Sequence, residues 1–160
     1  TASSGSKTSN TDGKNAMKYR GIENIYGNVN QFVDGVNIDN VDATTAYFYV
    51  NRDATTYASD IINGKYTKVR YNKLNAEGWV TKMGYDPTNP FLQMPQELNG
   101  NVSTKYGDYY WMTTTTDKKT TLFGGIWNDG SDAGISNFDL DYSSTHNAYF
   151  VGSRLLKTAF

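Results

Sequence analysis

The chain has 160 residues, a formal net charge of −1 and no cysteine. This length corresponds to one domain, and a chain without cysteine has no disulfide, thiolate metal site or cysteine nucleophile. The small net charge gives no electrostatic basis for nucleic-acid binding, and the apolar runs are far shorter than the roughly 18 residues that a membrane span needs. We therefore expect neither nucleic-acid binding nor membrane insertion.

The first half of the chain predicts a tail and two helices. Residues 1–16 are rich in Ser, Thr, Gly and Asn and have no hydrophobic period, so we expect a flexible linker or tail that precedes a domain over 17–160. Apolar side chains recur at intervals of three and four over 22–36, which predicts an amphipathic helix with Gly27 inside it. A second helix is predicted near 54–63.

The remainder predicts strands and long loops. Short β-rich stretches occur over 45–51, 66–71, 78–82, 109–115, 121–127 and 148–156. Residues 84–108 hold all three prolines and little periodicity, and we expect a long irregular segment there. The chain also carries 13 Tyr, whose rings bury well but whose hydroxyls need partners, so half-buried and interface positions are expected for many of them.

Three segments in the right order resemble a known family. Residues 19–35 read YRGIENIYGNVNQFVDG and resemble the "R-G-x-E-N-x-x-G-N-V-x-x-W-V-D-G" helix of C-type-lectin-like domains of the formylglycine-generating-enzyme branch. Residues 123–134, FGGIWNDGSDAG, resemble that family's "G-G-x-W-x-x-G-x-x-A-G", and 151–154, VGSR, resemble its closing "I-G-x-R". The chain departs from the family at Asn30 and Phe32, where relatives usually carry Trp, and this departure changes core packing.

The resemblance implies an α+β, C-type lectin-like fold, with a twisted antiparallel sheet, two helices and long irregular loops. The nearest look-alikes are C-terminal domains of phage tail and virion proteins. Variable proteins of diversity-generating retroelements are related, and in them the segment between the last two motifs is rewritten to change the ligand. The enzymes of this branch use cysteines for their chemistry, so the resemblance implies no enzymatic activity for this cysteine-free chain.

The segment between the last two motifs is the candidate binding face. If it is a strand, Asn137, Asp139 and Asp141 share one face, while the apolar Phe138 and Leu140 share the other. We expect the polar set to point outward, where composition alone favours a solvated face and the resemblance favours a ligand. The predicted ligand-binding residues are Ile126, Asn128, Asp132, Asn137, Asp139, Asp141 and Tyr142.

Two neighbouring features are interpreted as framework. Trp127 is expected in the core, and Arg154 is expected to tie loop carbonyls together through its five donors. The triplet Trp127-Asn128-Asp129 is similar to the calcium ligands of ordinary lectins, but the Glu-Pro-Asn partner is missing. Calcium needs six to eight oxygens from converging segments. We expect no cofactor, with calcium as the minor alternative.

The sequence thus favours a non-enzymatic ligand-binding module of a tail-associated phage virion protein, acting outside the cell on a host surface glycan or protein. The alternative is a decoration or assembly domain that docks another virion protein. Homo-oligomerisation within a virion is compatible with both. An atypical hydrolase of the same fold is less favoured, because no acidic pair or histidine stands in a catalytic motif.

Overall fold

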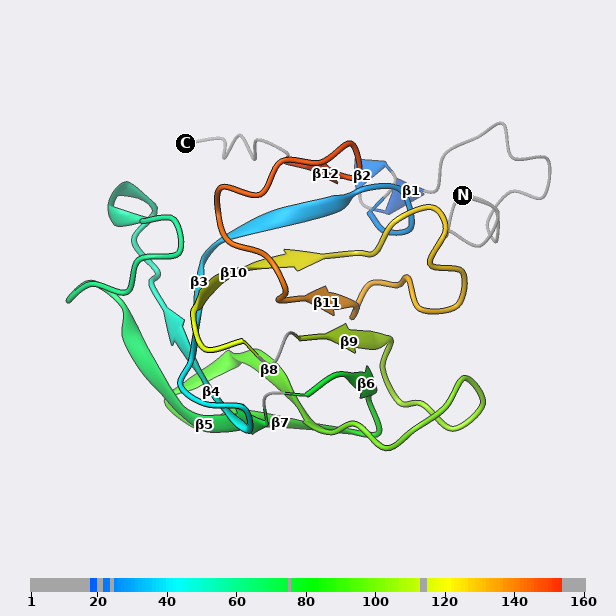
Figure 1. Ribbon diagram of the computed structural model, residues 1–160, viewed down its shortest axis with the longest axis horizontal. Coiled ribbons are helices and arrows are strands. Elements are labelled where there is room, and N and C mark those ends of the chain that lie inside the picture. The colour runs from blue at the N-terminus through cyan, green and yellow to red at the C-terminus, as the bar shows by residue number, and fades with distance from the viewer. Residues whose placement is uncertain (1–17, 20–21, 24, 75, 113–114, 154–160) are drawn as a thin grey trace.

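A computed structural model describes residues 18–19, 22–23, 25–74, 76–112 and 115–153. This part of the chain is almost entirely β-structure (Figure 1), and its one helical element is the single 3-10 turn η1, Ala54–Thr56. The predicted α+β fold with two helices is therefore wrong. The predicted tail, residues 1–16, lies outside the described residues.

Eight strands form the main sheet: β3 (Asn30–Asn40), β4 (Thr45–Val50), β5 (Thr67–Leu74), β6 (Gly78–Trp79), β9 (Tyr109–Trp111), β10 (Lys118–Phe123), β11 (Phe138–Asp139) and β12 (Val151–Gly152). Their order is β5-β4-β3-β10-β11-β9-β6, and β12 lies parallel to the beginning of β3. In Figure 1 the strands β12, β3, β10, β11 and β9 follow one another from top to bottom.

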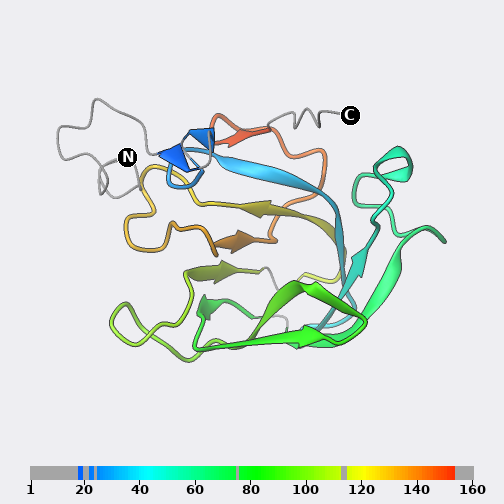
Figure 2. The same ribbon diagram turned by 180° about the vertical axis from the view of Figure 1, so that it is seen from behind.

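Two small hairpins complete the fold: β1 (Lys18–Tyr19) pairs with β2 (Ile22–Glu23), and β7 (Lys82–Asp86) pairs with β8 (Asn89–Glu97). The second hairpin lies along the lower edge of the molecule in both views (Figures 1 and 2). It shows that the irregular segment predicted over 84–108 is wrong up to Glu97, whereas residues 98–108 are irregular as predicted. Among the described residues, strand β8 pairs only with β7, so its other edge makes no ladder hydrogen bonds. Proline, which has no backbone N–H, is tolerated on such an edge strand.

The predicted helix over 22–36 is replaced by a turn and the first half of β3. Gly27 and Gly35 have φ of 68° and 82°, values that a right-handed helix excludes. Thr121 pairs with Val33 but Thr120 pairs with Asn37, so β3 bulges at Gly35. The bulge interrupts the regular alternation of side chains between the two faces of the sheet. Val33 and Val36, which are three residues apart, therefore lie on the same face. The bulge thus explains the three-residue spacing of Val33 and Val36, and the earlier apolar residues of the pattern lie in β2, in the turn over 25–29 and at the start of β3.

The core lies on one face of the sheet, under the β7–β8 hairpin. Strand β4 shows the pattern that builds it, because Ala46, Phe48 and Val50 point inward and the residues between them do not. The buried cluster consists of Ile38, Ala46, Phe48, Val50, Val69, Val80, Met94, Tyr110, Met112 and Leu140. The predicted strands over 45–51 and 66–71 are confirmed as β4 and β5. Those over 78–82, 109–115, 121–127 and 148–156 are matched in part, by β6, by β9, by β10, which ends at Phe123, and by β12.

The opposite face of β3 is covered by the loop that follows β4. Asn37, which is 1 % exposed, donates from Nδ2 to the carbonyl oxygens of Ala58 and Ile61 at 3.2 and 3.1 Å. Asn51 anchors the same loop through a bond from Nδ2 to Thr56 O at 3.1 Å. The second predicted helix, near 54–63, is therefore a loop held by side-chain amides, with η1 as its one helical turn.

Candidate functional site

The site begins where β10 ends, at two glycines. Gly124 and Gly125 have φ of 101° and 73°, and they turn the chain so that Ile126 forms a β-bridge with Asn28. A Cβ at Gly125 would lie 2.8 Å from Ala133, closer than real side chains approach. Glycine is therefore required here both for backbone conformation and for space.

Asn30 connects this turn to the next strand. Its Oδ1 accepts a hydrogen bond from Gly125 N at 3.0 Å, and its Nδ2 donates to Asp139 Oδ2 at 3.1 Å. The other carboxylate oxygen of Asp139, Oδ1, accepts from Asp141 N at 3.1 Å. Asn30 and Asp139 are 4 % and 7 % exposed, so one buried amide fixes the glycine turn against the carboxylate.

Burial changes the protonation of this carboxylate. It raises the pKa of Asp139 from 3.8 to about 7, although the hydrogen bond from Asp141 N–H opposes the shift. The negative charges of Asp141 and Asp129 raise it further. Burial also raises the pKa of Asp129, whose Oδ2 accepts from Ile126 N at 2.7 Å. The site therefore carries less negative charge at neutral pH than its three carboxyl groups suggest.

A cavity of about 300 Å³ opens beside Asp139. It is lined by Asn30, Trp111, Ile126, Asp129, Asp139, Asp141, Tyr142 and Phe150. These residues come from β3, β9, β11, the turn after β10 and the segment before β12, so the tertiary fold brings five separate parts of the chain together. We call this cavity the carboxylate pocket.

Aromatic rings continue outward from the carboxylate pocket. Tyr142 stacks on His146 with ring centroids 3.9 Å apart, and Phe150 lies 6.2 Å from Tyr142. Tyr149 meets Phe150 edge to face at 5.3 Å and lies 5.4 Å from Trp127. Tyr149 is 82 % exposed and Trp127 is 38 % exposed, so the aromatic series ends at the surface. We call these five residues the aromatic rim.

The structure brings four of the seven predicted binding residues into the pocket: Ile126, Asp139, Asp141 and Tyr142. Asn128 is exposed and does not line it. The other four lining residues, Asn30, Trp111, Asp129 and Phe150, were not among the predicted binding residues. No local pattern marked Asn30, because its partners Gly125 and Asp139 lie 95 and 109 residues further along the chain.

The predicted outward direction of the polar set is wrong for Asn137 and Asp139, which are 0 % and 7 % exposed. Alternation does hold within β11, because Phe138 packs against the core and Asp139 points to the other face. That other face is not free: the segment that carries Tyr142 and Phe150 covers it. Leu140 is fully buried, as predicted.

Trp127 does not lie in the core as expected, because the glycine turn carries it to the surface beside Tyr149. The second framework residue, Arg154, lies outside the described residues. Trp127 therefore does not hold the glycine turn in the core. The turn is instead fixed by the buried side chain of Asn30, which bonds to Gly125 and to Asp139.

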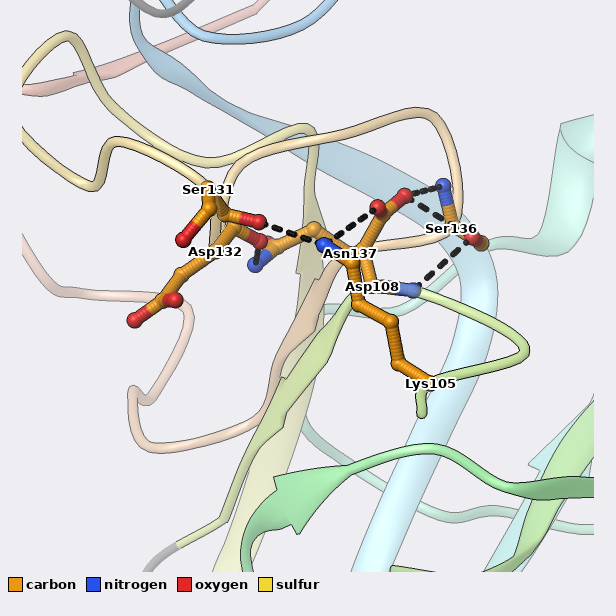
Figure 3. Close-up of polar contacts among 6 residues, drawn as sticks. All are labelled: Lys105, Asp108, Ser131, Asp132, Ser136 and Asn137. Carbon is orange, nitrogen blue, oxygen red and sulfur yellow. Dashed lines mark hydrogen bonds and ion pairs between the residues drawn. The ribbon is translucent and has the colours of Figure 1, made fainter. Parts of the chain in front are cut away.

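The remaining predicted residues, Asp132 and Asn137, belong to a separate polar cluster (Figure 3). Asn137 Nδ2 donates to Asp132 O at 2.8 Å. Nearby, Asp108 Oδ2 accepts from Ser136 N at 2.9 Å and from Ser136 Oγ at 2.8 Å. Lys105 Nζ lies 2.7 Å from Ser131 O and 3.7 Å from Asp108 Oδ1.

These bonds join the loop before β9 to the loop before β11. Lys105 also lies over the Trp79 ring, with Nζ 4.2 Å from the centroid. Lys105, Asp108 and the amide nitrogen of Asn137 contact each other's loops and backbone, which is the behaviour of a structural tie, and Asn137 Oδ1 is buried without a hydrogen-bond partner among the described residues. The cluster therefore explains why Asp132 and Asn137 are not in the carboxylate pocket.

Within the described residues, no group of three or more His, Asp or Glu side chains is arranged to hold a metal ion. In the same part of the chain, no helix has the length and hydropathy to span a bilayer. Three carboxyl groups beside Trp, Tyr and Phe rings can accept hydrogen bonds from a ligand and contact its apolar faces. No family model, curated protein or solved structure matches the chain.

Proposed function

We propose that the protein is a non-enzymatic ligand-binding module that takes a glycan in the carboxylate pocket. The observation that carries this proposal is the convergence of three carboxyl groups and three aromatic rings around one cavity of about 300 Å³. A sugar presents hydroxyl donors at its edge and C–H groups on its faces. Carboxylates suit the first, and the rings of Trp111, Tyr142 and Phe150 suit the second.

The aromatic rim supports a ligand longer than one sugar unit. Tyr149 and Trp127 expose their rings next to Phe150, a residue that lines the pocket. Exposed aromatic area of this kind is typical of binding surfaces, because rigid rings give contact area with little loss of conformational entropy. A glycan chain with one unit in the pocket would place its next unit on this rim.

The arrangement of Asp139 favours binding over catalysis. Both of its oxygens accept hydrogen bonds from Asn30 and Asp141. A general acid must present its proton to the leaving group, and these bonds hold the carboxyl toward protein instead. The raised pKa of Asp139 is explained by burial within a structural contact.

The setting on a phage virion and the host surface partner rest on the three motifs near residues 19–35, 123–134 and 151–154. The fold expected from that resemblance is absent, so the pocket is the stronger support. Many copies on a virion would raise a weak single-site affinity through avidity.

The test is binding of the purified protein to an array of glycans and cell-wall polymers. Asp141→Asn and Tyr142→Ala are expected to weaken binding of the recognised glycan at least tenfold, because each removes one of the two kinds of contact. Matched controls are Asn128→Ala, exposed on the glycine turn, and Tyr85→Ala, 61 % exposed on β7. Both controls are expected to stay within twofold of the unmodified protein.

Three outcomes would contradict the proposal. The first is equal binding by the pocket variants and the controls, which would place the contact elsewhere. The second is release of new reducing ends from the bound glycan, which would establish hydrolysis. The third is binding to a purified virion protein alone, with loss through Tyr149→Ala but not through Asp141→Asn, which would favour the assembly role.

A further inference from the structure

A second cavity lies on the opposite face of the same strands. It has a volume of about 270 Å³ and lies between the main sheet and strand β8 of the hairpin. The sheet side consists of Val33, Val36, Phe48, Tyr110, Thr121, Phe123 and Phe138, and the hairpin side consists of Leu92, Gln93, Met94 and Pro95. We call it the apolar cavity.

The bulge in β3 creates one wall of this cavity. In a regular strand, residues 33 and 36 would point to opposite faces. The bulge at Gly35 places both Val33 and Val36 against the same space. Two valines fill less volume than the large side chains facing them from the other strands, and a gap remains beneath the hairpin.

The two hydroxyl groups among the lining side chains are already hydrogen-bonded. Tyr110 donates its hydroxyl to Met112 Sδ at 3.1 Å, and Thr121 Oγ1 donates to Val36 O at 3.3 Å. Gln93 is an exposed residue. A buried water needs two to four polar partners, and a cavity without them stays dry or takes an apolar guest. The chemistry of the walls therefore selects against water and against polar ligands.

The size and the edges of the cavity define the guest. An engineered apolar cavity of about 150 Å³ holds one benzene molecule, and this one is nearly twice as large. Leu92, Phe123 and Phe138 at its walls are only partly buried, so the space has access to the surface. We infer that the apolar cavity is a second binding site, independent of the carboxylate pocket, for a compact apolar molecule about the size of two fused six-membered rings.

The experiment uses naphthalene as the probe and the ¹⁵N-labelled protein as the reporter. Naphthalene is expected to give saturable amide shifts at residues that line the apolar cavity and none at the carboxylate pocket. The filling variant Val33→Phe is expected to weaken binding at least tenfold, because its ring occupies the space. Its matched control is Val41→Phe, the same substitution at a 45 % exposed position outside the cavity, which is expected to bind as the unmodified protein does.

Leu92→Phe fills the cavity from the hairpin wall and decides the test if Val33→Phe does not fold. If neither variant folds, the location of the shifts in the unmodified protein decides it. The inference is overturned if naphthalene gives no saturable shifts up to its solubility limit. It is also overturned if a folded filling variant binds as tightly as the unmodified protein. Tyr142→Ala is expected to leave naphthalene binding unchanged, so failure here and failure of the glycan proposal are distinguishable.

Discussion

Two cavities share the same strands and differ in chemistry. In β9, Tyr110 faces the apolar cavity and its neighbour Trp111 faces the carboxylate pocket. In β11, Phe138 faces the apolar cavity and Asp139 faces the carboxylate pocket. Since successive side chains of a strand point to opposite faces, a shift of register by one residue would exchange the two environments.

The two faces of the sheet differ in the segment of chain that packs over them. The apolar cavity is covered by the β7–β8 hairpin, which contributes Leu92, Met94 and Pro95, and the Tyr110 and Thr121 hydroxyls on the sheet side are hydrogen-bonded. The carboxylate pocket is covered by the segment before β12, which brings Tyr142 and Phe150 over buried carboxyl groups. One sheet can therefore hold two sites of unlike chemistry when each face receives a different covering segment.

The largest expected difference between the two faces is in how strongly each makes the stability of the protein depend on pH. The pKa of Asp139 is about 7 in the folded protein and 3.8 as the reference for the unfolded chain, so between these values the folded state binds the extra proton. The stabilisation is complete below pH 3.8 and is lost as pH rises toward 7, and it is on the order of 4 kcal/mol. We expect the free energy of unfolding to fall less steeply over this range in Asp139→Asn.

Urea unfolding at half-unit pH steps measures this effect. The comparison is the slope of stability against pH in the unmodified protein minus the slope in Asp139→Asn, which removes the contributions of other carboxyl groups. Equal slopes would mean that Asp139 titrates as an exposed residue, contrary to its burial.

A smaller effect is expected from the glycine that supports each face. Gly35 has φ of 82°, and its Cβ would lie 2.7 Å from Asn51 O; Gly125 has φ of 73° and meets Ala133 at 2.8 Å. Substitution of either by Ala is expected to cost about 2–3 kcal/mol, because an L side chain is strained there and has no room. Gly64, with no atom within 4 Å of an added Cβ and no positive φ, is the control.

Ligand binding sharpens this prediction. Gly35→Ala is expected to impair naphthalene binding more than glycan binding, and Gly125→Ala is expected to do the reverse. Thermal unfolding of Gly35→Ala, Gly125→Ala and Gly64→Ala measures how much stability each substitution costs. A Gly35→Ala protein as stable as Gly64→Ala would show that β3 has no bulge at that position.

The smallest effect is expected at Trp127. A buried Trp or Phe replaced by Ala costs about 3–5 kcal/mol, but Trp127 is 38 % exposed and its ring contact is with the exposed Tyr149. We expect Trp127→Ala to lower stability by less than about 1 kcal/mol, whereas Phe48→Ala, at a 3 % exposed core position, should lower it by the larger amount. Denaturant midpoints measure both changes in stability. If Trp127→Ala lowers the free energy of unfolding as much as Phe48→Ala does, Trp127 is a core residue after all.

Several local features could be predicted from the sequence because they depend on neighbours along the chain. The alternation of β4 predicted its strand correctly, and the β-rich composition of 121–127 indicated the end of β10, although the strand stops at Phe123. The glycines at 124 and 125 indicated a turn with close backbone approach, and this is observed. The segment after this turn was predicted as the site, and Ile126, Asp139, Asp141 and Tyr142 do meet there.

Other features depend on contacts between distant parts of the chain. The helix predicted over 22–36 is wrong because this stretch is a turn between strands followed by a bulged strand, and the bulge is defined by pairing with β10, some 85 residues later. Asp139 was predicted to be exposed because the covering segment and the amide of Asn30, 109 residues away, are invisible to local alternation. The sequence by itself determined the alternation of β4 and the turn at Gly124 and Gly125, since these follow from local backbone geometry. Only the tertiary structure decided which face is covered and by what, because burial is set by segments that meet after the chain has folded.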